Sequence, residues 1–384
     1  MAKTVGAAIL CPKQLALSVA AAIIPLSHAS HAQVAPATLP TGAQVTAGAA
    51  TLSYSPNKLQ IDQTTNNAIL NWQSFSIGSS AWVNFSQPSS SAIALNRVMG
   101  TNPSEIFGRL TANGRVFLTN PNGVLFAPSA SVDVGGLFAT TLSIADKDFL
   151  AGRYNFYNDG GAKSVVNQGN IVTASGYAAL AGPQVRNDGV IVARAGSVVL
   201  AAGDRVSLDM IGDGLIKVSV DQAALNASAI NAGRIEADGG NVLLTARSAN
   251  ALLDTVVNNS GVIRANSLVE RNGEIILDGG SAGFVTNTGT LTASGTDTGG
   301  TGGTVSWPEA TVMPSTSYVH SKRSGPVFAK SWRLVTATSS STVIRTGANT
   351  ALSSTSPGDG LRSANSRPSM TKLPSCSTSP KSPP

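Results

Sequence analysis

Asn231-Ala-Gly-Arg-Ile-Glu-Ala237 is the most informative segment for the fold, because its pattern returns twice further along the chain. It recurs as Asn259-Ser-Gly-Val-Ile-Arg-Ala265 and as Asn287-Thr-Gly-Thr-Leu-Thr-Ala293, and two earlier forms begin at Asn167 and Asn187. The starts of the five copies are separated by 20, 44, 28 and 28 residues. Repeats at such intervals are typical of a solenoid, in which each repeat forms one coil and insertions lengthen the corners.

A second element, a glycine followed by a short aliphatic run, comes after several copies. Examples are Gly196-Ser-Val-Val-Leu200, Gly240-Asn-Val-Leu-Leu244 and Gly273-Glu-Ile-Ile-Leu277. Each coil would thus hold at least two short strands, joined by Asn and Gly corners that tolerate a left-handed backbone. Stacked coils pair each strand with its counterparts above and below, and let the repeated Asn residues form an amide ladder.

The alternative fold is a β-sandwich with Asn-Gly hairpins. Hairpin turns need not recur with the same phase of Ile or Leu and Ala, so we favour the solenoid. The pattern therefore predicts an all-β fold, a right-handed parallel β-helix, from about Thr38 to Ser306. Four early aromatic residues, Trp72, Phe75, Trp82 and Phe85, are expected to pack under an N-terminal cap that covers the open strand edge of the first coil.

Composition narrows the chemistry of this body. The chain has 384 residues, of which 39 are Gly and 12% are charged. Both cysteines and all three histidines lie outside the repeats, at Cys11, His28, His31, His320 and Cys376. The body therefore lacks disulfides, Ser-His-Asp and Cys-His catalytic groups and His-ligated zinc, and we expect no cofactor or metal.

Charge is unevenly distributed along the chain. Residues 1–304 hold 17 Lys and Arg against 18 Asp and Glu, whereas residues 305–384 hold 9 against 2. The net charge of +6 therefore comes from the C-terminal part. A nucleic-acid partner would need a basic face on the folded part, so no nucleic-acid binding is expected.

The first 32 residues read as a signal peptide. Lys3 and Lys13 provide the positive start, and Leu15–Leu26 is an apolar core shorter than the roughly 20 residues that span a bilayer. Ser30-His31-Ala32 offers small residues to a signal peptidase, so the mature chain is expected to start near Gln33.

The C-terminal part departs from the repeat. The pattern stops at Trp307-Pro308, and residues 307–384 are rich in Ser, Thr, Pro, Lys and Arg. Such a segment is expected to be disordered, either as a basic linker or as the product of a reading-frame break or a truncation. The expected organisation is a signal peptide at 1–32, a secretion domain with cap and first coils at 33–150, further coils at 151–306, and the tail.

The segment Ile61–Ile144 carries a resemblance to a known family. It rests on a series of motifs in fixed order: Ala68-Ile-Leu-Asn-Trp72-Gln-Ser-Phe75, Val83-Asn-Phe85-Ser-Gln-Pro88, Ala94-Leu-Asn96-Arg-Val98, Ile106-Phe-Gly108-Arg-Leu-Thr-Ala-Asn113-Gly114, Asn120-Pro-Asn-Gly-Val124-Leu-Phe126 and Val132-Asp-Val-Gly135-Gly136-Leu137. In this order they resemble the amino-terminal secretion domain of two-partner-secreted exoproteins, the filamentous haemagglutinin family. The looser β-helix resemblance extends to about Ser306.

The resemblance implies a route of export. Such proteins enter the periplasm, are recognised by an outer-membrane β-barrel partner with periplasmic domains, cross it as an extended chain, and fold outside. The expected location is the medium or the bacterial cell surface. Folding from the first coil onward suits a repeat protein, because each coil contacts only its neighbours.

The turn Asn120-Pro121-Asn122-Gly123 is the candidate site. Pro121 presets its own φ, and Gly123 is expected to take a positive φ. The resemblance implies that such a turn is recognised by the transporter, while a purely structural turn is the alternative. A second family motif, Asn-Pro-Asn-Leu, does not occur.

Three functions remain open. The first is an adhesin-like exported protein, with no catalysis and with a host-surface receptor or glycan as ligand. The second is the export module of a haemolysin or contact-dependent toxin. The third is a polysaccharide-degrading β-helix enzyme, for which Asp204, Asp209 and Asp213 with Arg205 form the nearest carboxylate cluster. We favour the first, because these carboxylates read as solvated loop residues.

Overall fold

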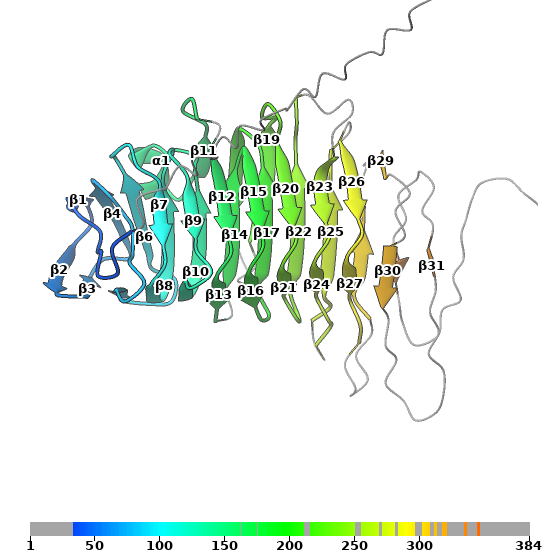
Figure 1. Ribbon diagram of the computed structural model, residues 1–384, viewed down its shortest axis with the longest axis horizontal. Coiled ribbons are helices and arrows are strands. Elements are labelled where there is room, and N and C mark those ends of the chain that lie inside the picture. The colour runs from blue at the N-terminus through cyan, green and yellow to red at the C-terminus, as the bar shows by residue number, and fades with distance from the viewer. Residues whose placement is uncertain are drawn as a thin grey trace, which may run out of the picture. The chain divides into compact units, whose positions relative to one another are not determined.

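The computed structural model describes residues 34–161, 163–174, 176–210, 216–249, 255–268, 271–280, 283–295 and 302–307, together with four short strands further on. The body consists of stacked coils whose strands pair in three parallel ladders, so the parallel β-helix predicted from the sequence is confirmed (Figure 1). Each coil passes from the third ladder to the first and then to the second.

Each ladder stacks its strands in chain order. The first ladder contains β3 (Lys58–Gln63), β5 (Trp82–Ser86), the first part of β8 (Arg109–Thr119), the first part of β10 (Ser131–Thr140), β13 (Asn170–Thr173), β16 (Val190–Ala193), β21 (Arg234–Glu236), β24 (Val262–Arg264) and β27 (Thr290–Thr292). The second contains β4 (Asn67–Trp72), β6 (Ile93–Val98), the later parts of β8 and β10, β14 (Tyr177–Gly182), β17 (Ser197–Ala202), β22 (Asn241–Ala246), β25 (Glu274–Asp278) and β28 (Thr304–Ser306). The third contains β7 (Ser104–Ile106), β9 (Val124–Phe126), β12 (Ser164–Asn167), β15 (Gln184–Asn187), β20 (Ser228–Asn231), β23 (Thr255–Asn259) and β26 (Phe284–Asn287).

Two antiparallel strands form the N-terminal cap. Strand β1 (Gln44–Ala47) pairs with β4, and β2 (Ala50–Ser55) pairs with β3. Trp72, Phe75 and Phe85 are buried in the interior of the first coils, as expected of residues under a cap. The expectation for Trp82 was wrong, because its ring lies on the outer face, between Lys58 and Arg109 at 4.2 and 5.0 Å from the ring centroid.

The repeated Ile or Leu supplies the interior of the later coils. Its five occurrences share one inward-facing row of the first ladder, and all are fully buried: Ile171, Ile191, Ile235, Ile263 and Leu291. Alternation along a strand turns every second side chain inward. The two-residue period within strands and the coil-length period between them therefore produce one continuous core.

The predicted amide ladder is present. The five repeated Asn residues end consecutive strands of the third ladder and are buried. Each side-chain amide donates to the side-chain oxygen of the next Asn along the stack, over 2.7 to 2.8 Å, in the order Asn167, Asn187, Asn231, Asn259 and Asn287. Each added coil thus satisfies the buried amide of the coil before it.

The reason expected for the corner glycines was wrong. Gly169, Gly189, Gly233, Gly261 and Gly289 do not have the positive φ that a left-handed corner would require. They are glycines because adjacent coils approach too closely for a side chain. A Cβ on Gly233, for example, would lie 2.1 Å from the carbonyl oxygen of Gly189.

An outer layer, not expected from the sequence, covers part of the second ladder. It comprises helix α1 (Asp146–Leu150) and an antiparallel sheet of β11 (Tyr154–Tyr157), β18 (Arg205–Asp209) and β19 (Lys217–Gln222). Its inner face packs on outward residues of the ladder to form a second buried cluster. In this cluster the rings of Phe138 and Phe156 have centroids 4.5 Å apart.

Four further strands lie inside the segment predicted to be a tail: β29 (Thr311–Val312), β30 (Ser317–His320), β31 (Leu334–Val335) and β32 (Ile344–Arg345). Strands β29 and β30 pair in parallel with β26 and β27, so pairing continues past the boundary expected at Ser306. The rest of residues 308–384, and the expected signal peptide, lie outside the described residues. No helix in the described part of the chain has the length and apolar character of a membrane span.

Candidate recognition turn

The turn from Asn120 to Gly123 joins β8 of the second ladder to β9 of the third. The backbone N–H of Gly123 donates to the carbonyl oxygen of Asn120 over 3.0 Å, which closes a four-residue turn. Gly123 has a φ of +117°, as expected from the sequence. A Cβ there would meet nothing closer than 3.6 Å, so backbone conformation rather than crowding requires glycine.

Asn120 is fully buried, and its side chain uses both of its polar ends. Its amide nitrogen donates to the Oγ of Ser104 and to the carbonyl oxygen of Asn102, each over 3.0 Å. Its side-chain oxygen accepts from the backbone N–H and the side-chain amide of Asn122, over 3.0 and 3.1 Å. These contacts fix the turn and leave Asn120 nothing to offer a partner once the chain is folded.

Asn122 and Gly123 attach the turn to the preceding loop. The side-chain amide of Asn122 donates to the carbonyl oxygen of Gly100 over 2.8 Å. The backbone N–H of Ser104 donates to the carbonyl oxygen of Gly123 over 3.0 Å. The loop Gly100–Ser104 is thus the other half of the site. Sequence reasoning missed it, although the adjacent Asn102-Pro103 offered a signal of an ordered turn.

The surface that the folded turn offers is small. Pro121 and Asn122 are half-buried, whereas Asn120 and Gly123 are buried. None of the four side chains is ionisable, so the turn can offer a partner only its shape and its hydrogen-bonding groups.

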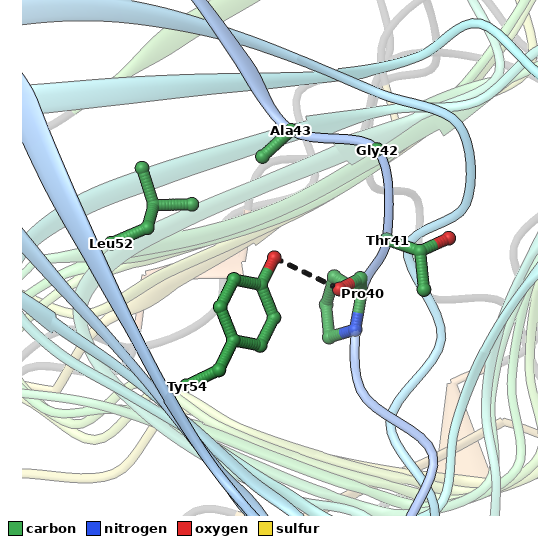
Figure 2. Close-up of a pocket in the computed structure, with 6 residues that line it drawn as sticks. All are labelled: Pro40, Thr41, Gly42, Ala43, Leu52 and Tyr54. Atoms are coloured by element: carbon green, nitrogen blue, oxygen red, sulfur yellow. Dashed lines mark hydrogen bonds between the residues drawn. The ribbon is translucent and has the colours of Figure 1, made fainter.

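A cavity of about 410 Å³ opens elsewhere, in the cap. It is lined by Pro40, Thr41, Gly42, Ala43, Leu52 and Tyr54, and Figure 2 shows Leu52 and Tyr54 facing it from β2. The Tyr54 hydroxyl donates to the carbonyl oxygen of Pro40 over 3.1 Å, and burial raises the pKa of that hydroxyl.

The carboxylates considered for an enzyme do not converge around this cavity. Asp204 precedes β18, and its side chain accepts a hydrogen bond from Asn158 over 2.7 Å. Asp209 ends the same strand, opposite Lys217. Asp213 lies outside the described residues.

Comparison with known proteins identifies the family. Residues 37–295 match the family model of the TPS secretion domain, where TPS stands for two-partner secretion. The chain is 35% identical over 269 residues to the heme/hemopexin-binding protein of Haemophilus influenzae strain Rd, which covers 68% of this chain and 29% of the relative. It is 32% identical over 243 residues to another heme/hemopexin-binding protein of that species, covering 58% and 26%. The chain therefore spans less than a third of the length of these relatives.

A solved structure agrees with the match. The secretion domain of HMW1 from Haemophilus influenzae superposes with a TM-score of 0.61 at 32% sequence identity, over 67% of each chain. The family model covers more than half of the chain, and it includes both the cap and the turn at Asn120. The chain belongs to the family of exported proteins that carry a two-partner secretion domain.

Proposed function

We propose that this chain is the export module of an adhesin-like protein of the bacterial surface or medium, and that it performs no catalysis. Its partner is an outer-membrane β-barrel transporter with periplasmic domains. Family membership supports this assignment, because proteins with this domain are exported through the periplasm. The expected signal peptide at 1–32 would deliver the chain to that compartment.

The transporter reads the segment Asn120–Gly123 while the chain is still extended. The observation that carries this step is the internal use of the Asn120 and Asn122 amides, which hydrogen bond to Ser104, Asn102 and Gly100 in the folded coil. In the extended chain the same amides are free to bond with an edge strand of a periplasmic domain. Folding then withdraws them, so the bound state and the folded state compete for the same groups.

The test separates recognition of the sequence from stability of the turn. Asn120→Ala/Asn122→Ala removes the amides in both states of the chain. Ser104→Ala removes an acceptor of the folded turn but leaves the segment Asn120–Gly123 intact. Each variant is co-expressed with the transporter, secretion into the medium is measured, and unfolding by urea is measured on the purified chains.

We expect both variants to lose stability, by about 1 to 3 kcal/mol for each buried group left without a partner. Only the Asn double variant should remain in the periplasm. Equal secretion of both variants and wild type would leave the turn a purely structural element. Retention of both variants would show that export depends on turn stability, and would also contradict reading of the extended segment.

A host ligand is the second part of the proposal. Two relatives are named for binding heme and hemopexin, which favours a host-derived ligand over cleavage of a polysaccharide. We propose that the ligand site lies outside the secretion domain. If the same module exported a haemolysin or a toxin, the active region would likewise lie outside this domain. Binding of the purified chain to immobilised hemopexin tests this placement. We expect no binding, and saturable binding would move the ligand site into the module.

A further inference from the structure

The cap leaves one edge of strand β2 open. All six residues of β2 pair with β3, from Ala50 opposite Gln63 to Ser55 opposite Lys58, without a shift of register. No strand among the described residues pairs with the other side of β2. An open edge presents unpaired backbone N–H and C=O groups that can bind another strand, and proteins usually protect such edges with charges, prolines or bulges. The sequence Ala50-Thr-Leu-Ser-Tyr-Ser55 has none of these.

Apolar groups accompany this edge. Tyr54 of β2 is 53% exposed, although it belongs to the cap of a buried core. The side chains of Leu52 and Tyr54 face the cap cavity of about 410 Å³ (Figure 2). A strand added to β2 would turn every second side chain toward the same cavity. The edge thus combines backbone hydrogen-bonding groups with a place for apolar side chains, the two requirements of strand addition.

We propose that the occupant of this edge is β2 of a second copy of the chain. In an antiparallel pair centred on Ser53, Leu52 of each copy lies opposite Tyr54 of the other, on the cavity side. Thr51 then lies opposite Ser55 on the outer side. Residues directly opposite in an antiparallel pair share a face, so this register matches apolar with apolar and polar with polar side chains.

Charge also favours a second copy. An edge with charged residues would select a partner of opposite charge and repel itself, but the pairing Thr51–Ser55 brings no two charges together. The arrangement is isologous and closes at two copies, because the pairing occupies the open β2 edge of both copies. The result is a dimer joined cap to cap, whose two β-helices extend in opposite directions. This inference does not depend on the proposed transporter.

The oligomeric state of the full chain tests the proposal, measured by light scattering across a wide range of concentration. Ser53→Lys places two ammonium groups side by side on the two-fold axis. Ser86→Lys is the matched control, since Ser86 is also an exposed serine near the start of the first ladder, and its strand β5 is paired on both sides. We expect wild type and Ser86→Lys to be dimers and Ser53→Lys to be a monomer with an unchanged β-sheet spectrum.

Two outcomes would overturn the proposal: a wild-type chain that stays monomeric at every concentration, or a Ser53→Lys variant that remains dimeric. If Ser53→Lys does not fold, Tyr54→Ser decides instead, because it removes both Leu52–Tyr54 contacts of the dimer without adding charge. A monomeric wild type whose Ser53→Lys variant alone loses secretion would assign the edge to a strand of the transporter, and would equally reject the second copy.

Discussion

The first coils and the later coils of this β-helix provide hydrogen bonds for their buried polar side chains in different ways. From β3 to β10, buried polar side chains hydrogen bond through contacts that occur once, such as Trp72 Nε1 to Asn96 Oδ1 at 3.0 Å and Gln87 Nε2 to Gln63 Oε1 at 3.1 Å. From β12 to β26, one contact recurs from coil to coil as the Asn ladder. A repeat that is visible in the sequence thus reflects a contact that every coil shares, whereas the first coils depend on individual contacts.

The largest expected effect comes from a stack of glycines in the later coils, Gly176, Gly196 and Gly240, in which each glycine lies against the one before it. A Cβ on Gly196 would lie 1.7 Å from the carbonyl oxygen of Gly176, so two coils must separate at that corner. We expect Gly196→Ala to cost about 4 kcal/mol, measured by urea unfolding. Gly136→Ala is the control from the first coils, because its nearest neighbour is a flexible Arg115 carbon at 3.2 Å. Similar costs for the two variants would contradict the account of the stack.

A smaller loss is expected in the Asn ladder. Asn187→Ala removes the acceptor of Asn167 and the donor to Asn231, each at 2.7 to 2.8 Å. Two buried amides then lose their partner in the ladder, which should cost about 3 kcal/mol. Hydrogen exchange should show faster opening at the coils on both sides of Asn187, and unchanged protection in β4 and β6. Uniform loss of protection throughout the β-helix would argue against coupling between nearest neighbours.

The third prediction concerns a contact that is made once. Trp72→Phe leaves the Oδ1 of buried Asn96 without its indole donor, and we expect a loss of about 2 kcal/mol. Trp82→Phe is the control, since its indole donates to Thr111 over 2.7 Å on the outer face, where the bond is only partly buried. The control should lose less than about 1 kcal/mol in thermal unfolding. Equal losses of stability would mean that the interior Trp72–Asn96 hydrogen bond stabilises the fold no more than the outer Trp82–Thr111 bond does.

The smallest expected effect concerns Tyr177, in the second buried cluster under the outer layer, at high pH. Burial raises the pKa of Tyr177, an effect that Arg115 partly offsets. The neutral hydroxyl therefore contributes stability below the unfolded pKa of about 10, and that contribution is lost as the pH rises further. Tyr177→Phe should cost about 1 kcal/mol at neutral pH, because the hydroxyl donates to the sulfur of Met210 over 3.1 Å. Above pH 10 the gap between the two proteins should shrink, and a constant gap would contradict this role.

Sequence reasoning reached the fold because the Asn, Ile and Ala positions of the repeat are the ladder and core positions of the structure. It missed the outer sheet, since β11 and β18 are far apart in the chain and follow no repeat. At the candidate turn the positive φ of Gly123 was foreseen from local chemistry. The partners Gly100 and Ser104 were not, because contacts between coils depend on how the coils stack.

If the chain is an export module, its secretion must depend on the transporter. The full chain would be expressed with and without the outer-membrane β-barrel partner, and the medium and periplasm assayed for the chain. We expect folded chain in the medium or on the cell surface only when the transporter is present, and retention in the periplasm without it. Equal amounts outside the cell in both cases, or retention in both, would contradict the assignment as an export module.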